Sequence, residues 1–486
     1  MNHQIKPRTV LEASLANALA GADARASGVA LLPDAGEAFA VRAATAREAG
    51  RSLDLQYYMW RGDVTGQLLA QEVLAAADRG VTVRLLLDDV YALGRERTLG
   101  ALDSHPQIEV RLFNGTRWRM FGRWGFLLEM LFGGWHLNRR MHNKSWIADG
   151  CLAVVGGRNL GDEYFGLGSP DAVQFRDLDL VIAGPAAAQA TRVFNEYWAS
   201  PLARPAALTA ATAERQGGLP GLRQVLDRAE DRPAADALLA RLERNTLAQI
   251  SAGLTPAEWG AIRVVADPPE KARRGLRAGR RARAAGGIAL DIAGALRDAR
   301  HEALLISPYF VPGRIGLRLL LELRRRGVRV SVVTNSLAAT DVVAVHGGYA
   351  KYRKRLLKAG VTLFELKPRG TDEKTSLLGS RGASLHTKAF VVDGETAFVG
   401  SFNLDHRSIA LNTEMGAFVH NPAIAREVAT EHARLSDPAM SWEAVWDGNR
   451  MGWREGGALL RSEPASERWK RAVVWLVQRL PVEEQL

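Results

Sequence analysis

A set of chemically reactive residues occurs twice in this chain with the same internal spacing. The first copy, MHNKSWIADGCLAVVGGRN, covers residues 141–159, and the second, SLHTKAFVVDGETAFVGSFN, covers residues 384–403. In both copies Lys follows His by two positions, Asp follows it by seven and Asn by seventeen. Agreement at so many positions indicates an internal duplication. Because the period is far longer than that of a solenoid repeat, it predicts two similar domains.

The duplicated residues supply two imidazoles, two ammonium groups and two amides. In the first copy they are His142, Lys144, Asp149, Gly157 and Asn159. In the second copy they are His386, Lys388, Asp393, Ser401 and Asn403. A two-residue step along an extended segment points the His and the Lys to the same side. If the two copies face each other, the set suits a phosphodiester, with a histidine on either side of phosphorus.

The expected reaction proceeds in two steps. One neutral imidazole attacks phosphorus and forms a phosphohistidine, while the other protonates the leaving alkoxide and then acts as a base on an alcohol or water. Histidine suits both roles because its protonation changes near neutral pH. No group of residues has the spacing of a metal site, and the single cysteine, Cys151, excludes a thiolate zinc site, so we expect neither a metal nor a cofactor.

Each histidine needs a hydrogen-bond partner on its second ring nitrogen. Glu414, in LNTEMG, is the candidate partner of His386. Asp177, in FRDLDL, is the candidate partner of His142, with Asp179 as a competing choice. These two carboxylates are therefore predicted to orient the histidines.

The remaining motif residues have less certain roles. Asp149 and Asp393 either belong to the catalytic set or brace the segment that carries the lysine, and the sequence leaves both interpretations open. The residues expected to bind the phosphate oxygens are Asn159, Asn403, Ser401 and Gly157.

Both halves alternate strands and helices with short connections. In the first half we predict a helix at 37–49, a strand at 53–60, a helix at 63–79, and strands at 81–90 and 108–113. In the second half we predict a strand at 304–311, a helix at 315–326, a strand at 328–336, a helix at 351–359 and a strand at 361–367. This order predicts an α/β fold with parallel βαβ units.

The chain of 486 residues is too long for one core and suits two domains. We predict a polar helix and connector at 1–36, a first domain at 37–200, an inter-domain connection at 201–290 and a second domain at 291–486. The connection is rich in Ala and Arg, and its basic run at 271–283 is interpreted as a solvated face. The C-terminal helix, with apolar residues from 469 to 480, is expected to pack on the core.

The double HxKxxxxDxxxxxxGS/GxN pattern resembles that of the phospholipase D superfamily. Further stretches are similar to bacterial cardiolipin synthases of the C type, namely GGRNLGDEYF at 156–165, TNSLAATD at 334–341 and SFNLDHRSIALNTEMG at 401–416. The resemblance implies two phospholipase D-type domains, each a mixed sheet flanked by helices, packed as a pseudo-dimer with one active site at their interface. It also implies the phosphohistidine mechanism.

The resemblance implies a phosphatidyltransferase that passes a phosphatidyl group to the hydroxyl of phosphatidylglycerol. The donor is a second phosphatidylglycerol or phosphatidylethanolamine, and His142 is expected to attack first by analogy with relatives. The first copy departs from the family pattern at Gly157, where the second keeps Ser401. The second copy therefore has a hydroxyl group that the first copy lacks. Such a difference is consistent with one histidine acting as the nucleophile and the other as the acid and base.

A segment before the first motif has the composition of a membrane-surface element. Its expected lipid contacts are Arg117, Trp118, Arg119, Arg123, Trp124 and Trp135. The alternative is a helical hairpin buried against the second domain. The chain shows no spanning segment or secretory signal and carries a net charge of +11, so we expect a protein peripheral on the cytoplasmic side of the cell membrane.

Three alternatives remain. A phospholipase or a nuclease could share this fold, and an inactive lipid-binding protein belongs to another class. Nucleic acid is an unlikely partner because the 117–135 segment is richer in long aliphatic residues than a groove that follows a nucleic-acid strand. Two intact His-Lys pairs argue against an inactive protein. The sequence does not identify an accessory protein.

Overall fold

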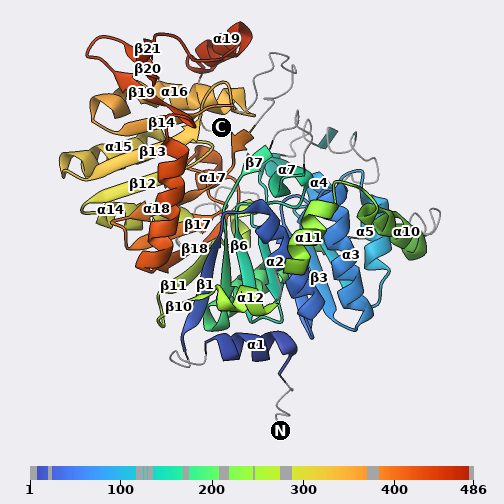
Figure 1. The fold of residues 1–486 in the computed structure, drawn as a ribbon. Helices are drawn as coiled ribbons and strands as arrows, with labels where there is room; N and C mark the ends of the chain where they lie inside the picture. The colour runs from blue at the N-terminus through green and yellow to red at the C-terminus, as the bar shows by residue number, and fades with distance from the viewer. Residues whose placement is uncertain are drawn as a thin grey trace.

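Two mixed sheets, each covered by helices, make up the described part of the chain (Figure 1). The computed structural model describes residues 8–19, 25–116, 124, 128–129, 135–167, 174–206, 218–244, 247–273, 287–368 and 383–480. Among these residues, none of the helices combines the length and the apolar character that a membrane crossing requires.

The first sheet is built mainly from the first half of the chain. Its strands are β1 (Ser27–Leu32), β2 (Ser52–Tyr57), β3 (Thr82–Asp88), β4 (Ile108–Phe113), β5 (Ser145–Ala148), β6 (Leu152–Gly156), β8 (Asp179–Ala183), β9 (Ala203–Pro205) and β10 (Thr255–Ala257). Their order is β10-β1-β8-β6-β5-β2-β3-β4-β9. The expected parallel core is confirmed for β2, β3 and β4, whereas the other neighbours pair antiparallel.

The second sheet repeats this plan. Its strands are β11 (Ile262–Ala266), β12 (Glu302–Ile306), β13 (Arg329–Asn335), β14 (Thr362–Leu366), β16 (Ala389–Val392), β17 (Thr396–Gly400), β18 (Met415–His420), β19 (Ser441–Trp446), β20 (Met451–Glu455) and β21 (Ala458–Leu460). The order β18-β17-β16-β12-β13-β14 matches β8-β6-β5-β2-β3-β4 strand for strand. The duplication seen in the motifs therefore extends to six strands of each sheet.

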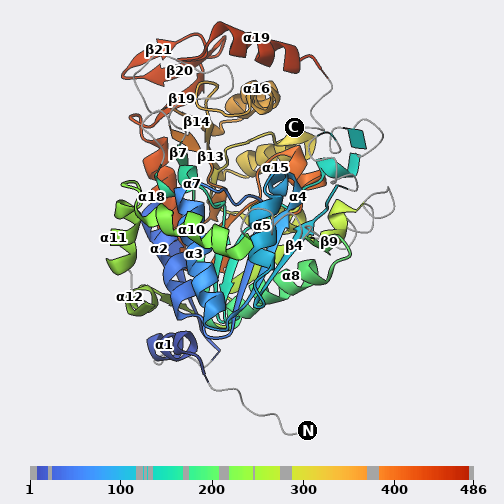
Figure 2. The same cartoon turned by 90° about the vertical axis from the view of Figure 1, so that its right-hand side faces the viewer.

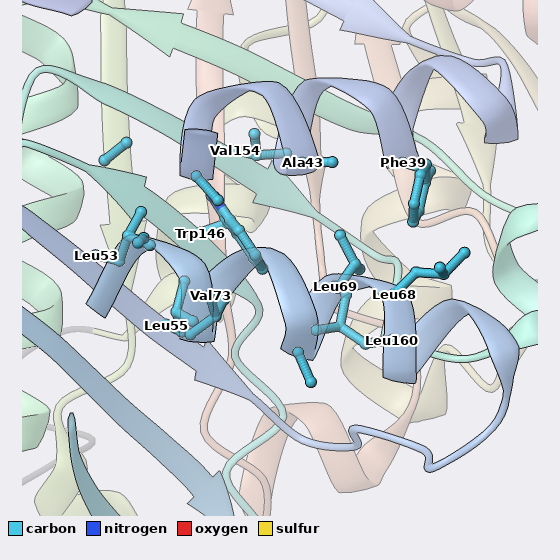
Figure 3. Close-up of a cluster of buried hydrophobic side chains, with 14 of the residues drawn as sticks. Phe39, Ala43, Leu53, Leu55, Leu68, Leu69, Val73, Trp146, Val154 and Leu160 are labelled. Carbon is cyan, nitrogen blue, oxygen red and sulfur yellow. The ribbon is translucent and has the colours of Figure 1, made fainter. Parts of the chain in front are cut away.

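Helices cover both faces of the sheets. They include α2 (Ala35–Glu48), α3 (Val64–Asp78), α5 (Glu96–Asp103), α8 (Ala187–Ala199), α14 (Ile288–Asp298), α15 (Gly313–Arg325), α16 (Val343–Lys358), α18 (Pro422–Ser436) and α19 (Arg468–Val477). Helix α3 begins at the N-cap Asp63, whose carboxylate accepts a hydrogen bond from Gly66 N. Its helical apolar spacing buries Leu69 and Val73 against strands β2 and β5 and helix α2 (Figure 3).

An apolar interface joins the two sheets. Strand β6 lies against β17 and β18, and the three run side by side in the middle of Figure 1. Small side chains such as Ala153, Ala397 and Ala417 are fully buried there, which lets the sheets approach closely. Val155 and Val399 belong to the same cluster. The two halves therefore share one hydrophobic core beneath the candidate site.

Two predicted segments contain more structure than expected. Within 1–36, strand β1 is an integral part of the first sheet, because it pairs with β8 over five residues. This short strand was missed because an apolar run such as SGVALL shows no alternation of polar and apolar residues. Within 201–290, helices α10 (Gly218–Glu230), α11 (Asp236–Arg244) and α12 (Leu247–Ala252) pack against the first half, and β11 joins the second sheet.

Helix α19 packs on α16 through part of its surface. A Cβ added at Gly347 of α16 would lie 2.8 Å from Val477 of α19, so the helices are in close contact. Val474 and Val477 are buried there, whereas Leu476 and Leu480, which belong to the predicted apolar stripe, are exposed. Packing on the core therefore uses only part of that stripe.

Candidate active site

The two His-Lys pairs lie where the parallel strands of both sheets end. His142 and Lys144 precede strand β5 in an extended segment, and His386 and Lys388 lie between β15 (Ala383–Leu385) and β16. All four side chains are buried. Each pair is therefore held in extended backbone just before a strand.

The backbone before each histidine pairs with the other half of the chain. Strand β15 pairs in parallel with β7 (Gln174–Arg176), and His386 N donates to the carbonyl oxygen of Arg176 at 2.8 Å. In the same way, His142 N donates to the carbonyl oxygen of Thr413 at 2.8 Å. The residue after each acceptor is a carboxylate. Each histidine is thus placed beside an acidic residue from the opposite half.

The imidazole–carboxylate pairs cross between the halves. His142 Nδ1 lies 2.8 Å from Glu414 Oε2, and His386 Nδ1 lies 2.5 Å from Asp177 Oδ2. The predicted pairing of Glu414 with His386 and of Asp177 with His142 is therefore wrong, because the strand pairing exchanges the partners. Both rings turn Nδ1 to the carboxylate, which leaves Nε2 for the reaction.

Asp179, the competing choice, has a different role. Arg42 Nη2 donates to Asp179 Oδ2 at 2.8 Å, and Arg158 Nη1 lies 3.2 Å from the same oxygen. Burial alone would raise the pKa of Asp179, but the two guanidinium groups hold it below its usual value. Asp179 therefore belongs to a buried ion-pair network in the first half.

Side chains at the ends of the central strands fix the backbone beside each histidine. Asp88, the last residue of β3, accepts a hydrogen bond from Met141 N at 2.9 Å. The equivalent residue of β13, Asn335, accepts from Leu385 N at 2.9 Å and donates to the carbonyl oxygen of the same residue at 3.0 Å. The backbone that carries the histidines is thus anchored at corresponding places in both halves.

The two lysines are buried together. Lys144 Nζ donates to the carbonyl oxygen of His142 at 2.6 Å, and Lys388 Nζ donates to that of His386. Burial lowers the pKa of Lys388 to about 8. Burial also lowers the pKa of Lys144 well below its usual value, and repulsion by Lys388 adds to the effect. An anion placed between these groups would raise both pKa values and relieve their repulsion.

Both histidines are electrically neutral near neutral pH. Burial lowers the pKa of His142 to about 4, and Lys144 adds to the shift while Glu414 opposes it. Burial, with Lys388 and Lys144, lowers the pKa of His386 well below its usual value. A neutral imidazole keeps the lone pair that a nucleophile requires.

The two orienting carboxylates differ in their hydrogen-bond donors. Ser401 Oγ donates to Glu414 Oε2 at 2.5 Å, and Ser408 Oγ donates to Oε1 at 2.9 Å. A Cβ at Gly157, the counterpart of Ser401, would lie only 2.1 Å from Asp177 Oδ1. The first half therefore needs glycine at this position, because Asp177 occupies the space that a side chain would take.

The two carboxylates also differ in their protonation, to which the serine donors of Glu414 contribute. Burial raises the pKa of Asp177 to about 7, although Lys388 and Arg158 oppose the shift. Burial would also raise the pKa of Glu414, but His142, Lys144 and the Ser401 hydroxyl lower it. Glu414 is thus ionised at neutral pH, whereas the Asp177–His386 pair holds a proton below about pH 7.

Gly157 and Ser401 do not offer the donors that phosphate binding would use. Gly157 N donates to the carbonyl oxygen of Leu178 at 3.1 Å, and Ser401 N donates to that of Met415 at 2.8 Å. Because the Ser401 hydroxyl is also bonded to Glu414, the predicted phosphate contacts of these two positions are corrected to a structural role.

The two asparagines lie in the buried part of the site. Asn159 Nδ2 donates to the hydroxyl of Tyr164 at 2.9 Å. Oδ1 of Asn159 and Oδ1 of Asn403 are buried and have no hydrogen-bond partner in the structure. Such unsatisfied amide groups are unfavourable unless a bound group completes them. The asparagines therefore remain candidates for contact with a ligand.

Asp149 and Asp393 lie at the opposite end of the sheets. The Asp149 carboxylate accepts hydrogen bonds from the backbone N–H groups of Gly50, Arg51 and Ser52. Asp393 binds the equivalent amides of Arg300, His301 and Glu302.

Asp149 binds the first residue of β2, whereas the histidines lie near the last, so the length of β2 gives the approximate distance between Asp149 and the site. Ser52 begins this strand and Tyr57 ends it five residues later, so about 17 Å separates the Asp149 end of the strand from the end at the histidines. Of the two interpretations, the structure supports the brace and corrects the catalytic assignment of both aspartates.

The predicted lipid-contact segment is only partly described. Arg117, Trp118, Arg119 and Arg123 lie outside the described residues, as does the side chain of Trp135. Trp124 is 73% exposed. Nearby, Thr116 Oγ1 donates to the buried Glu129 at 2.5 Å. Of the six expected lipid contacts, Trp124 can thus be placed, and it faces solvent.

One group of three titratable residues outside the site has metal-like geometry in the described part of the chain. It consists of His346, Glu365 and Glu463. Arg353 forms ion pairs with both carboxylates, at 3.1 Å in the case of Glu365. The guanidinium already supplies the positive charge that a metal ion would bring. We therefore interpret the cluster as a buried ion-pair network.

Several aromatic residues of the site were not predicted. The ring of Tyr58 lies edge-on to His142 with centroids 5.1 Å apart, and Lys144 Nζ lies 5.3 Å from the Tyr58 ring centre. The rings of Tyr164 and Phe175 lie 5.2 and 5.1 Å from His386. Tyr58 directly follows strand β2, and Phe175 lies two residues before Asp177. Their closeness in sequence to a strand end and to a site residue was the only sequence signal that could have placed these two aromatic residues near the histidines.

The chain is similar to known proteins over nearly all its length. The family profile described as "Cardiolipin synthase, PLD-like domain" matches residues 43–198 and 292–436. Cardiolipin synthase C of Escherichia coli K12 is 40% identical over 473 residues, which cover 92% of this chain and 93% of that protein. Cardiolipin synthase A of Pseudomonas putida is 25% identical over 82% of this chain and 65% of its own length.

One solved structure shows the same fold. Phosphatidylserine synthase of Haemophilus influenzae Rd KW20 superposes with a TM-score of 0.60 at 13% identity. The match covers 97% of this chain and 100% of that one.

Replacing Asp149 with Ala should destabilise the protein without altering its chemistry. The variant loses the acceptor of three backbone N–H groups, and hydrogen bonds to charged groups contribute about 1.5–3 kcal/mol each to stability. We expect a lower melting temperature and an unchanged kcat/KM at a temperature where the variant stays folded.

Asp393→Ala provides the matched comparison in the second half. A large fall in kcat/KM with an unchanged melting temperature in either variant would contradict the assignment as a brace.

Proposed function

This chain belongs to the cardiolipin synthase family with phospholipase D-like domains, and on that basis we propose how its site works as a phosphatidyltransferase. The enzyme transfers a phosphatidyl group from one phospholipid to a hydroxyl of another. A phosphohistidine carries the group between the two steps. The donor is phosphatidylglycerol or phosphatidylethanolamine, and the acceptor is phosphatidylglycerol.

His142 is the proposed nucleophile. Its partner Glu414 is ionised and accepts a hydrogen bond from Nδ1–H, which leaves the Nε2 lone pair free to attack phosphorus. His386 shares a proton with Asp177, which makes this pair the source of the proton for the leaving alkoxide. In the second step the same pair takes the proton from the attacking hydroxyl.

The observation that carries this proposal is the crossed pairing of the histidines around two buried lysines. Each imidazole is fixed by a carboxylate from the other half, so both rings belong to one site. Burial lowers the pKa of both lysines, and Lys388 further lowers the pKa of Lys144, so an anion between them would stabilise their charged forms. The Nδ2 groups of Asn159 and Asn403 would donate to the phosphate oxygens, whereas their unpaired Oδ1 atoms would accept from a hydroxyl of the lipid headgroup. A phosphodiester supplies the negative charge that the two lysines require and accepts hydrogen bonds from the amide Nδ2 groups.

The enzyme is proposed to act as a peripheral protein on the cytoplasmic side of the cell membrane. Support comes from the exposed Trp124, from the net charge of +11 and from the relationship to cardiolipin synthases. Cations near an anionic surface contribute about 1 kcal/mol each. The headgroup of the bound phospholipid would then have to leave the lipid layer so that its phosphodiester reaches the buried site.

Labelled phosphatidylglycerol, supplied with and without phosphatidylethanolamine, should give cardiolipin. His142→Ala and His386→Ala should each remove nearly all turnover, and the double variant should be little worse, because the residues act as a unit. Phosphatidic acid as the main product would indicate a hydrolase instead. A phosphohistidine trapped on His386 and not on His142 would reverse the order of attack.

The pH profile of kcat/KM should be bell-shaped. Activity should fall as the pH drops towards about 4, because His142 becomes protonated and loses its lone pair. It should also fall as the pH rises above about 7, because the Asp177–His386 pair loses its proton. Ser401→Ala removes a hydrogen bond that lowers the pKa of Glu414, so it should move the acidic limb upward. An acidic limb at the same pH in Ser401→Ala as in the wild type would contradict the role of Ser401.

Trp124→Ser should weaken binding to vesicles that contain phosphatidylglycerol by about tenfold, since one large apolar side chain is lost from the lipid layer. Trp259→Ser is the matched control, because this residue is 64% exposed but lies between β10 and β11, at the end of the sheets away from the site. Equal effects of both substitutions in a sedimentation assay would argue against a specific membrane contact.

A further inference from the structure

An apolar pocket of about 420 Å³ lies beside the candidate active site in the first half. It is enclosed by α3, α5, α10 and the short helix α4 (Asp89–Ala92), which lie together in Figure 2. Its apolar lining includes Ala70, Leu87, Leu99, Leu222, Val225 and Leu226. The charged residues Arg61, Asp63, Asp88 and Arg95 also line the pocket. This volume falls within the roughly 300–1,000 Å³ typical of small-molecule sites.

The pocket and the catalytic site share a wall. Tyr58 lines the pocket, and its ring lies 5.1 Å from that of His142. Tyr91, also in the pocket, lies 4.8 Å from Tyr58. Asp88 lines the pocket too and accepts a hydrogen bond from Met141 N, next to the histidine. Only a pair of tyrosine rings therefore separates the proposed nucleophile from an apolar space.

The outer wall of the pocket comes from helix α10, within the 201–290 segment that was predicted to be an inter-domain connection. Helix α10 is fixed to α3 by Arg223, whose two terminal nitrogens bind the carboxylate of Asp78 at 2.8 and 2.7 Å. This pairing leaves the apolar face of α10 turned to the pocket, where Leu226 is buried and Val225 is 45% exposed. A largely apolar pocket that shares the wall of Tyr58 with a polar catalytic site fits an amphipathic molecule.

We propose that this pocket binds one acyl chain of the phospholipid whose phosphodiester is attacked by His142. The inference rests on the proposed function, since it assumes a phospholipid substrate. The headgroup phosphate lies at the two lysines, and the chain extends past Tyr58 and Tyr91 between α5 and α10. Each buried methylene group increases binding by about fourfold. Helix α10 is thus a determinant of acyl-chain recognition.

Filling the pocket should reduce activity on long-chain substrates selectively. Val225→Trp on α10 and Thr98→Trp on α5 change pocket residues that are exposed, so folding should not suffer. Both variants should lower kcat/KM for dioleoyl-phosphatidylglycerol in mixed micelles by at least tenfold. Activity on the dihexanoyl lipid should stay within twofold, because that lipid buries far fewer methylenes. Gln224→Trp and Arg97→Trp are controls on the same helices that do not line the pocket.

A second measurement separates this proposal from the proposed function. Phosphatidylglycerol with a photoreactive group in its acyl chain should crosslink to α5 and α10 in the wild type and not in Val225→Trp. If no transfer occurs with any phospholipid but crosslinking is found there, the function fails and the pocket assignment stands. Equal losses with both chain lengths, unchanged activity of both filled variants, or crosslinks elsewhere would overturn the pocket assignment.

Discussion

Two buried imidazole–carboxylate hydrogen bonds that cross between the halves are the interactions on which the active site depends. Each requires a strand-like contact from one half to the other, so the site exists only when the sheets are packed together. The apolar cluster that contains Ala153 and Ala417 supplies the close approach. Packing and chemistry are thus linked through the same interface.

The burial of these pairs sets the charge state of the site. A carboxylate, an imidazole and an ammonium placed in low dielectric all favour their neutral forms unless neighbours compensate. Glu414 has two serine hydroxyls to stabilise its charge, whereas Asp177 has a backbone N–H from Leu178 and no counterpart of Ser401. One half therefore offers a base-like imidazole and the other an acid. His142 and Lys144 make the largest contributions to the ionisation of Glu414, and Ser401, whose counterpart is Gly157, adds to it.

The sequence was sufficient to predict the repeated motifs and most of the regular elements. Helix α3 and strand β4 follow directly from helical spacing and from a short apolar run. The partners of His142 and His386 could not be assigned, because spacing along the chain does not tell which half contributes each carboxylate. The sequence left Asp149 open between a catalytic and a bracing role, because the motif spacing does not show that its carboxylate binds the backbone at the start of β2. The aromatic contacts of Tyr58 and Tyr164 depend on tertiary packing alone.

The unlike residues Gly157 and Ser401 have a consequence for how such a site can evolve. In a dimer of identical chains, every substitution appears on both sides of the symmetry axis, so a glycine and a serine could not occupy the two equivalent places. Joining the copies in one chain removes this constraint. A shorter acid with glycine and a longer acid with serine can then be selected independently. Fusion of the two copies in one gene thus allows the two equivalent positions to carry different residues and the two histidines to have different roles.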